Sequence, residues 1–210
     1  MKIQTIVEGY GDVIAVPVLL RRLRDEAGAY GLDVGRPIRS RHSDLVQETS
    51  LRKVVQLARR QPQCGAILVL LDSDDACPKE KAPEIEAWAR AETGDVPVAV
   101  VMAKSEFEAW FLAAVESLRG MRGIVENAEP PEKPEEIRGA KERLEELMLR
   151  GRSYSETADQ AALAAQFDMS QAYRECRSFR RLASVFGRLV ESLGVEHNAW
   201  PPDSWQAGNP

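Results

Sequence analysis

Cysteine and histidine are scarce in this sequence: its 210 residues include three cysteines and two histidines. Cys64, Cys77 and Cys176 are widely spaced and form no CxxC pair, so the pattern supports neither a disulfide framework nor a structural zinc site. The two histidines, His42 and His197, are too few for a histidine-rich metal site. We interpret both as ordinary polar residues and not as catalysts.

Long apolar runs are absent as well. The longest, residues 65–71 and 96–103, are far shorter than the roughly 20 residues that span a bilayer. The first residues lead directly into a strand-like segment and do not resemble a signal peptide. We therefore expect a cytoplasmic protein without membrane contacts.

Carboxylate side chains are abundant. The 33 Asp and Glu residues outnumber the 28 Lys and Arg residues, which gives a net charge of -5. With 44% hydrophobic and 29% charged residues, the composition is that of an ordinary globular domain. The net charge alone does not indicate or exclude a nucleic-acid partner, so the positions of the acids carry the information.

The first half of the chain alternates apolar segments of strand length with longer helical patterns. We expect strands at residues 2–7, 33–39, 66–71 and 97–102, and helices at residues 14–29, 50–60, 83–92 and from about 105. This alternation is typical of an α/β fold, with a parallel sheet of about four strands covered by helices. The strand at 66–71 is nearly all aliphatic, so we expect it in the centre of the sheet.

A Pro- and Glu-rich segment follows the expected sheet and is interpreted as an exposed connector. The expected organisation is an α/β domain at 1–125, the connector at 126–136, a helical subdomain at 137–195 and an irregular tail at 196–210. The tail either frays or docks through Trp200 and Trp205.

Acidic residues follow three of the expected strands. They are Glu8 and Asp12 after the first strand, Asp72 and Asp74 after the third, and Glu106 and Glu108 after the fourth. Ligands of open α/β sheets bind beyond the carboxyl ends of the strands, so acids at these positions suggest function. In an extended chain Asp72 and Asp74 point to the same side. If Glu106 and Glu108 are helical, only one of them faces the cleft, but if the helix begins at Ser105 the other can still reach the cleft from the first turn.

Each acidic cluster also has a structural interpretation. Asp12 can cap the following helix, and residues 72–75 can form a solvated turn. Glu106 and Glu108 can compensate a helix dipole. Glu8 is harder to explain in this way, because a charged residue directly after a buried strand must pair, bind a metal or reach solvent.

Several carboxylates in one cleft repel one another, at a cost of roughly 1 to 4 kcal/mol for each pair about 4 Å apart. A bound cation relieves this repulsion, and oxygen ligands suit a hard divalent ion. We therefore expect one or two Mg²⁺ or Mn²⁺ ions, with the six acids as candidate ligands: Glu8, Asp12, Asp72, Asp74, Glu106 and Glu108. Lys104, which follows the fourth strand, either balances the acids, contacts a phosphate or is simply solvated.

The motifs VEGYGD, LLDSDD and EFEAWFLA, followed by SYSET and ECRSFRRL, resemble an uncharacterised TOPRIM-like bacterial family. TOPRIM domains occur in topoisomerases, primases and the overcoming-lysogenization-defect (OLD) nucleases. By this resemblance Glu8 corresponds to the TOPRIM glutamate, and Asp72 and Asp74 correspond to the DxD pair of TOPRIM domains. Asp12 corresponds to a second acid that OLD nucleases carry. Glu106 and Glu108 belong to the motif of the uncharacterised family itself.

The resemblance implies a Mg²⁺-dependent nuclease, with Glu8, Asp72 and Asp74 as catalytic residues. We add Lys104 to this catalytic set because of its position after the fourth strand. The resemblance also implies a role in phage defence beside an ATPase of the ABC or AAA type. No tyrosine or domain of a topoisomerase, and no nucleotidyl-transfer apparatus of a primase, is recognisable.

Two alternatives belong to other functional classes. One is a regulatory subunit of an ATPase complex that senses a metal or a nucleotide without cleaving anything. The other is a phosphatase of the haloacid dehalogenase type, with Asp72 as nucleophile and Asp74 as acid. The phosphatase is disfavoured by Ala76, where a threonine or similar residue is expected, and by a DxD pair that follows the third strand and not the first.

A nuclease with a net negative charge needs a local basic surface for the phosphate backbone. One candidate is the pair Arg39 and Arg41 after the second strand. The other is Arg177 and Arg181. If residues 171–193 form one helix, these two share a face with Arg174 and Arg188. Salt bridges to the many glutamates are the alternative role for each arginine.

Overall fold

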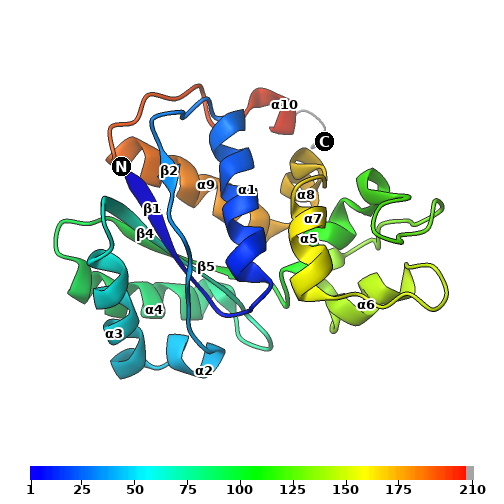
Figure 1. The fold of residues 1–210 in the computed structure, drawn as a ribbon, viewed down its shortest axis with the longest axis horizontal. Coiled ribbons are helices and arrows are strands. Elements are labelled where there is room, and N and C mark those ends of the chain that lie inside the picture. The colour runs from blue at the N-terminus through cyan, green and yellow to red at the C-terminus, as the bar shows by residue number, and fades with distance from the viewer. Residues whose placement is uncertain (207–210) are drawn as a thin grey trace.

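A parallel β-sheet forms the centre of the computed structural model, which describes residues 1–206 (Figure 1). Within these residues the sheet has five strands: β1 (Lys2–Val7), β2 (Asp33–Val34), β3 (Ile38–Arg39), β4 (Cys64–Asp72) and β5 (Val98–Ala103). Their order is β2-β1-β4-β5, and β3 pairs with the later part of β1. The expected α/β fold with a parallel sheet is confirmed, and β4 is a central strand.

The second expected strand is divided into two short ones. Residues 35–37 separate β2 from β3, and Pro37 has no backbone N–H to donate to a neighbouring strand. The carbonyl of Arg36 instead accepts a hydrogen bond of 2.6 Å from the Gln4 amide. Both short strands still pair in parallel with β1.

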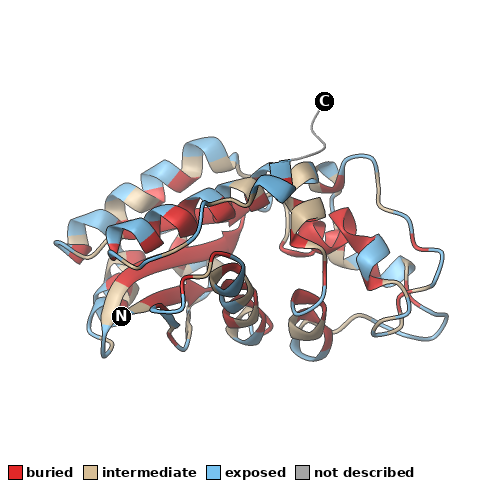
Figure 2. Cartoon of the chain, turned by 90° about the horizontal axis from the view of Figure 1, so that it is seen from above, coloured by how far each residue is buried: buried red, intermediate tan, exposed pale blue. Residues whose placement is uncertain are grey.

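The longer helices cover both faces of the sheet. The described helices are α1 (Asp12–Glu26), α2 (His42–Leu45), α3 (Glu48–Arg59), α4 (Pro78–Thr93), α5 (Glu108–Ala113), α6 (Ala140–Glu146), α7 (Ala161–Ala164), α8 (Met169–Glu175), α9 (Arg177–Ser192) and α10 (Asp203–Gln206), with 3-10 turns at Val115–Leu118 and Pro134–Glu136 and a π turn at Glu156–Gln160. Alternate residues of β4 face opposite layers, because successive strand side chains point to opposite sides. Val69 and Leu71 pack with α3 and α4, whereas Leu68 and Leu70 pack with α1 and α9. Figure 2 shows the buried strands between these layers.

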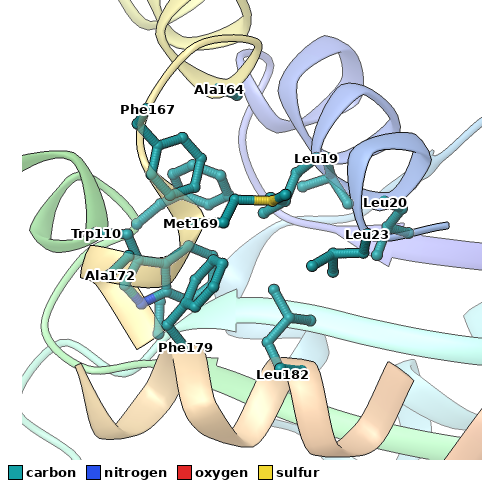
Figure 3. Close-up of a cluster of buried hydrophobic side chains, with 14 of the residues drawn as sticks. Leu19, Leu20, Leu23, Trp110, Ala164, Phe167, Met169, Ala172, Phe179 and Leu182 are labelled. Carbon is teal, nitrogen blue, oxygen red and sulfur yellow. The ribbon is translucent and has the colours of Figure 1, made fainter. Parts of the chain in front are cut away.

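The segments after α5 share a hydrophobic core with α1 and the sheet. Trp110, Phe167 and Phe179 lie in one buried cluster with Leu19 and Leu182 (Figure 3). The Trp110 and Phe179 rings meet edge to face, with centroids 5.3 Å apart. The core therefore joins the C-terminal helices to the side of the sheet that α1 covers.

The tail docks through its tryptophans. This is one of the two alternatives that the sequence left open, the other being a frayed end. Trp205 is 3% exposed, and its ring centroid lies 5.2 Å from that of Trp200. Trp200 donates a hydrogen bond of 2.8 Å to the carbonyl of Ala183 in α9. Residues 207–210 of the expected irregular tail lie outside the described residues.

Residues 171–193 do not form one helix, so the condition for four arginines on one face is not met. Helix α8 ends at Glu175, and α9 begins at Arg177. The residue between them, Cys176, is extended and buried, and the carboxylate of Glu135 accepts the first N–H groups of α9. Arg174 therefore does not share a helix with the other three arginines.

Membrane crossing is not supported by the helices of residues 1–206, since none of them combines the required length and apolar character.

Candidate functional site

Two of the three acidic clusters meet at neighbouring strand ends. Strands β1 and β4 pair in parallel with Val7 opposite Leu70, so Glu8 directly follows β1 beside the end of β4. Asp72 is the last residue of β4. The third cluster follows β5, whose Ala103 pairs with Asp72. The parallel register therefore brings the predicted acids to one edge of the sheet.

Asp72 lies at the centre of this acidic site. Its side chain is buried, and its Oδ1 accepts a hydrogen bond of 2.8 Å from the backbone N–H of Phe107. Burial raises the pKa of Asp72 well above its ordinary value. The charges of Glu108, Glu8 and Asp12 raise it further. Four carboxyl groups therefore interact across the edge of the sheet.

Glu108 is a buried acid with one unsatisfied oxygen. It begins α5 and has no exposed surface. Its Oε1 accepts a hydrogen bond of 2.8 Å from the hydroxyl of Tyr154, while Oε2 has no hydrogen-bond partner within residues 1–206. Burial raises the pKa of Glu108 to about 7, although Lys141 and Tyr154 act in the opposite direction. An unpaired buried oxygen of this kind is a ready acceptor for a cation or a proton.

Glu106 has a different environment from Glu108. Its Oε2 accepts a hydrogen bond of 2.9 Å from the backbone N–H of Lys141, in the first turn of α6. Of these two glutamates, Glu108 is the one whose charge raises the pKa of Asp72. Helix α5 begins at Glu108, so Glu106 lies before the helix. Glu106 thus fixes the start of the helix that carries Lys141.

Lys141 brings a positive charge to the acids. Its Nζ lies 2.8 Å from Oε1 of Glu156. Burial alone would lower the pKa of Lys141, but the attraction of Glu108, Glu156 and Asp72 outweighs it and raises the pKa above its ordinary value. The lysine is therefore charged at neutral pH. Sequence reasoning missed it, because it lies in a charged helix about 70 residues beyond Asp72 and no motif marks it.

Glu8 is held by a histidine. His42, at the start of α2, places Nδ1 2.7 Å from Glu8 Oε2 and Nε2 3.6 Å from Asp74 Oδ2. Burial raises the pKa of Glu8, and the charges of Asp12 and Asp74 add to this, while His42 lowers it. His42 is thus a partner of two predicted site residues, which its sequence context did not indicate.

Asp74 does not extend from the same face as Asp72, so that expectation is wrong. Strand β4 ends at Asp72, and Asp74 lies in a turn with a positive φ of 47°. This left-handed conformation redirects the chain, and the side chain of Asp74 is 64% exposed. It lies near His42, at the open side of the site, whereas Asp72 points inward.

Asp12 is fixed from two sides and is not the helix cap. Its Oδ2 accepts the N–H of Gly9 at 2.9 Å, and its Oδ1 accepts a hydrogen bond of 3.1 Å from the Gln160 amide. Burial raises the pKa of Asp12. Gly11 permits this arrangement, because a Cβ there would collide with Oε1 of Gln160 and lie 2.8 Å from the carbonyl oxygen of Glu156.

Lys104 and the predicted arginines lie on two sides of the acids. Lys104, Arg177 and Arg181 line a groove beside β5, and their side chains form no ion pair within residues 1–206. Arg39 lies on the β1 side, with its guanidinium carbon 3.9 Å from the centroid of the Tyr10 ring. Arg41 precedes His42 there, as the N-cap of α2.

Comparison with known families places most of the chain in a described family. The model of a domain of unknown function (DUF4276) matches residues 7–186. The chain belongs to the DUF4276 family. No curated protein and no solved structure matches it significantly. The matched region includes all the acids described above and also Lys141 and Tyr154, so the DUF4276 domain contains the whole cluster.

The donor chemistry of this DUF4276 site fits a hard cation, although the side chains do not form a complete cage. Within residues 1–206 no group of three or more His, Cys, Asp or Glu side chains is arranged to hold a metal ion. Mg²⁺, however, is commonly bound by one or two carboxylates, with water and substrate phosphate as the other ligands. The buried carboxylate of Asp72 and the unpaired oxygen of Glu108 are suitable donors of this type.

Proposed function

We propose that the protein is a metal-dependent nuclease of the TOPRIM type, which cleaves phosphodiester bonds in nucleic acid with one or two Mg²⁺ or Mn²⁺ ions. The main support is the position of Asp72: its carboxylate is buried at the end of a central strand, next to Glu8 at the end of the neighbouring strand. The charges of Glu108, Glu8 and Asp12 raise the pKa of Asp72. Clusters of carboxyl groups with strongly shifted pKa values occur preferentially at functional sites.

The acids are assigned to cation binding according to their burial and partners. Asp72 and Glu8, at neighbouring strand ends, are the primary ligands of the cation. Asp12 and Glu108 add negative charge near the cation and strengthen its binding. We assign Asp74, whose side chain is exposed, to a cation that enters with the substrate. The chemistry that a bound divalent ion supplies is Lewis-acid activation of the phosphate and of the attacking water.

We assign Lys141 the role of stabilising the negative charge that develops on the scissile phosphate. It is a charged amine within an acidic site, and Glu106 and Glu156 fix its backbone and its side chain. A preorganised cation of this kind stabilises a charged transition state without reorganising at the moment of reaction. Glu106 is therefore a positioning residue and not a metal ligand in this proposal.

The biological setting is carried by the resemblance alone. It implies a nucleic-acid substrate, a role in phage defence and an ATPase partner of the ABC or AAA type.

The alternative function is a subunit that senses a metal or a nucleotide without cleavage. It is favoured by one observation: Glu8, Asp12 and Asp72 already accept hydrogen bonds from protein donors.

A cleavage assay tests the proposal. Wild-type protein, D72N, E8Q and the control D75N are incubated with supercoiled plasmid, single-stranded DNA or RNA in Mg²⁺, Mn²⁺ or EDTA. Asp75 follows the DxD pair, but its side chain is 86% exposed and pairs with Arg138. D75N therefore changes an acid of the same loop and leaves the buried acids intact. We expect metal-dependent cleavage by the wild type and D75N and a loss of about 100-fold or more in D72N and E8Q. Equal cleavage by D72N would refute the assignment.

A further inference from the structure

A groove of about 830 Å³ runs along the outer edge of β5. Its floor includes Val100 and Met102 of β5 and the apolar start of α4, and the beginning of α9 forms the opposite wall. Strand β5 is the last strand on this side of the sheet. We call this feature the β5-edge groove.

The β5-edge groove is unsuited to the addition of another strand. Ser73 donates to the carbonyl of Ala103, so alternate residues of β5 bond to the β4 side and the others face the groove. Of the outward-facing residues, Val100 already donates its N–H to the carboxylate of Glu86, at 3.2 Å. Side chains and not the backbone therefore determine what the groove binds.

Unpaired positive charges line the β5-edge groove. Its lining contains six basic and four acidic side chains, in a protein whose net charge is -5. Lys79, Lys104, Arg177 and Arg181 have side chains without an ion pair or a hydrogen bond in the described part of the chain. Such charges repel one another unless an anion joins them.

Part of the acidic lining is already occupied. Both carboxylate oxygens of Glu135 accept hydrogen bonds of 2.8 Å from backbone N–H groups of Arg177 and Ser178. Glu136 pairs with Lys133 at 3.2 Å. Glu135 keeps its charge, but these N–H groups hold its carboxylate at the start of α9. In the described residues, two lining acids, Glu132 and Glu175, and four lining bases are left without a partner, and the six bases of the lining outnumber its four acids.

The β5-edge groove begins beside the acids. Lys104, in its lining, directly precedes Ser105, whose N–H donates to Ser73 at 2.9 Å. Ser73 lies between Asp72 and Asp74 in the chain. A polyanion that follows the groove toward the carboxyl end of β5 therefore reaches the proposed cleavage site.

We propose that the β5-edge groove binds the phosphate backbone of the nucleic-acid strand that is cleaved at Asp72. This inference rests on the proposed function and adds the path of the substrate. Lys104, at the inner end of the groove, contacts the phosphate nearest to the acids, and Arg177 and Arg181 of α9 contact phosphates farther away. The apolar floor accommodates sugars or bases, and no base-specific contact is implied.

Binding of a fluorescent 20-nucleotide single strand, measured by anisotropy with Mg²⁺, tests the groove. The test uses the full chain in a D72N background to prevent cleavage. R177A/R181A is the variant, and R188A is the matched control, because Arg188 is an exposed arginine of the same helix outside the groove. We expect R177A/R181A to bind at least 10-fold more weakly at about 0.1 M salt and to reduce the salt slope by roughly 1.4. R188A and R177K/R181K should bind like the parent.

Unchanged binding by R177A/R181A, or no binding by the parent, would overturn the groove assignment. Binding of a polyglutamate peptide without binding of nucleic acid would also overturn it, since the groove would then accept an acidic protein segment. Cleavage by the otherwise wild-type chain separates the two proposals. Groove-dependent binding without cleavage refutes the nuclease and retains the groove, whereas cleavage with groove-independent binding refutes the groove alone.

Discussion

The hydroxyl of Tyr154 donates a hydrogen bond of 2.8 Å to the buried carboxylate of Glu108, 46 residues earlier in the chain. This bond connects the segment before the π turn to the first turn of α5. Among residues 1–206 no other side chain donates a hydrogen bond to Glu108, and this bond lowers the pKa of that carboxyl group. The C-terminal half of the chain therefore opposes the effect of burial on the pKa of an acid near Asp72.

Replacing Tyr154 with phenylalanine removes this donor and leaves both oxygens of Glu108 without a partner. Hydrogen bonds to charged groups contribute about 1.5 to 3 kcal/mol, so we expect the free energy of unfolding at pH 8 to fall by that amount. Urea denaturation measures it. Y173F is the control, because Tyr173 packs on Trp205 and its hydroxyl makes no hydrogen bond within residues 1–206. A loss no larger than that of Y173F would contradict the role of Tyr154.

The buried acids predict an unusual dependence of stability on pH. Because the pKa of Glu108 is raised from 4.5 to about 7, the folded state binds a proton more tightly than the unfolded chain does. Its stabilising contribution is complete below pH 4.5 and is lost as the pH rises through 7, by on the order of 3 kcal/mol. The raised pKa of Asp72 acts in the same direction.

Glu108→Gln removes this titration and keeps the side-chain volume. In EDTA, we expect the free energy of unfolding of the wild type to fall between pH 5 and pH 8, and that of E108Q to fall less. Urea denaturation at four pH values in this range measures both slopes. Identical slopes would show that Glu108 does not titrate in this window.

The strand pattern was a sound guide to the fold for physical reasons that are local. The β4 segment is an almost unbroken aliphatic run, and such runs occur in strands buried on both faces. The parallel order of β1 and β4 then placed Glu8 and Asp72 at neighbouring ends. The pattern did not indicate that Pro37 interrupts the second strand. It also did not indicate the break between α8 and α9, where Cys176 is buried and the carboxylate of Glu135 accepts the first N–H of α9.

The remaining site residues were hidden because tertiary packing, and not sequence spacing, brings them to the acids. Lys141 and Tyr154 lie in segments that carry many charges or have no regular period. The close contact of Gln160 with Gly11 joins positions about 150 residues apart. Asp74 was misplaced because a left-handed turn in a non-glycine residue cannot be inferred from a DxD pattern.

Gly11→Ala tests the packing of α1 against the π turn. The new Cβ would collide with Gln160 and lie 2.8 Å from the backbone oxygen of Glu156, which cannot rotate away. Overpacking of this kind costs about 1 to 3 kcal/mol, which we expect as a loss in the free energy of unfolding. G31A is the control, since its Cβ would meet only Val195, at an ordinary 3.5 Å. Equal stability of G11A and G31A would exclude the close contact.

Anomalous scattering from crystals soaked in Mn²⁺ tests the proposed metal site directly. The carboxylates of Asp72 and Glu8 predict at least one Mn²⁺ peak within coordination distance of both, with Glu108 or Asp74 near it, and no such peak in D72N crystals. One or two peaks would also give the number of ions. Wild-type crystals with Mn²⁺ only on the outer surface, and none at Asp72, would contradict the metal-dependent mechanism.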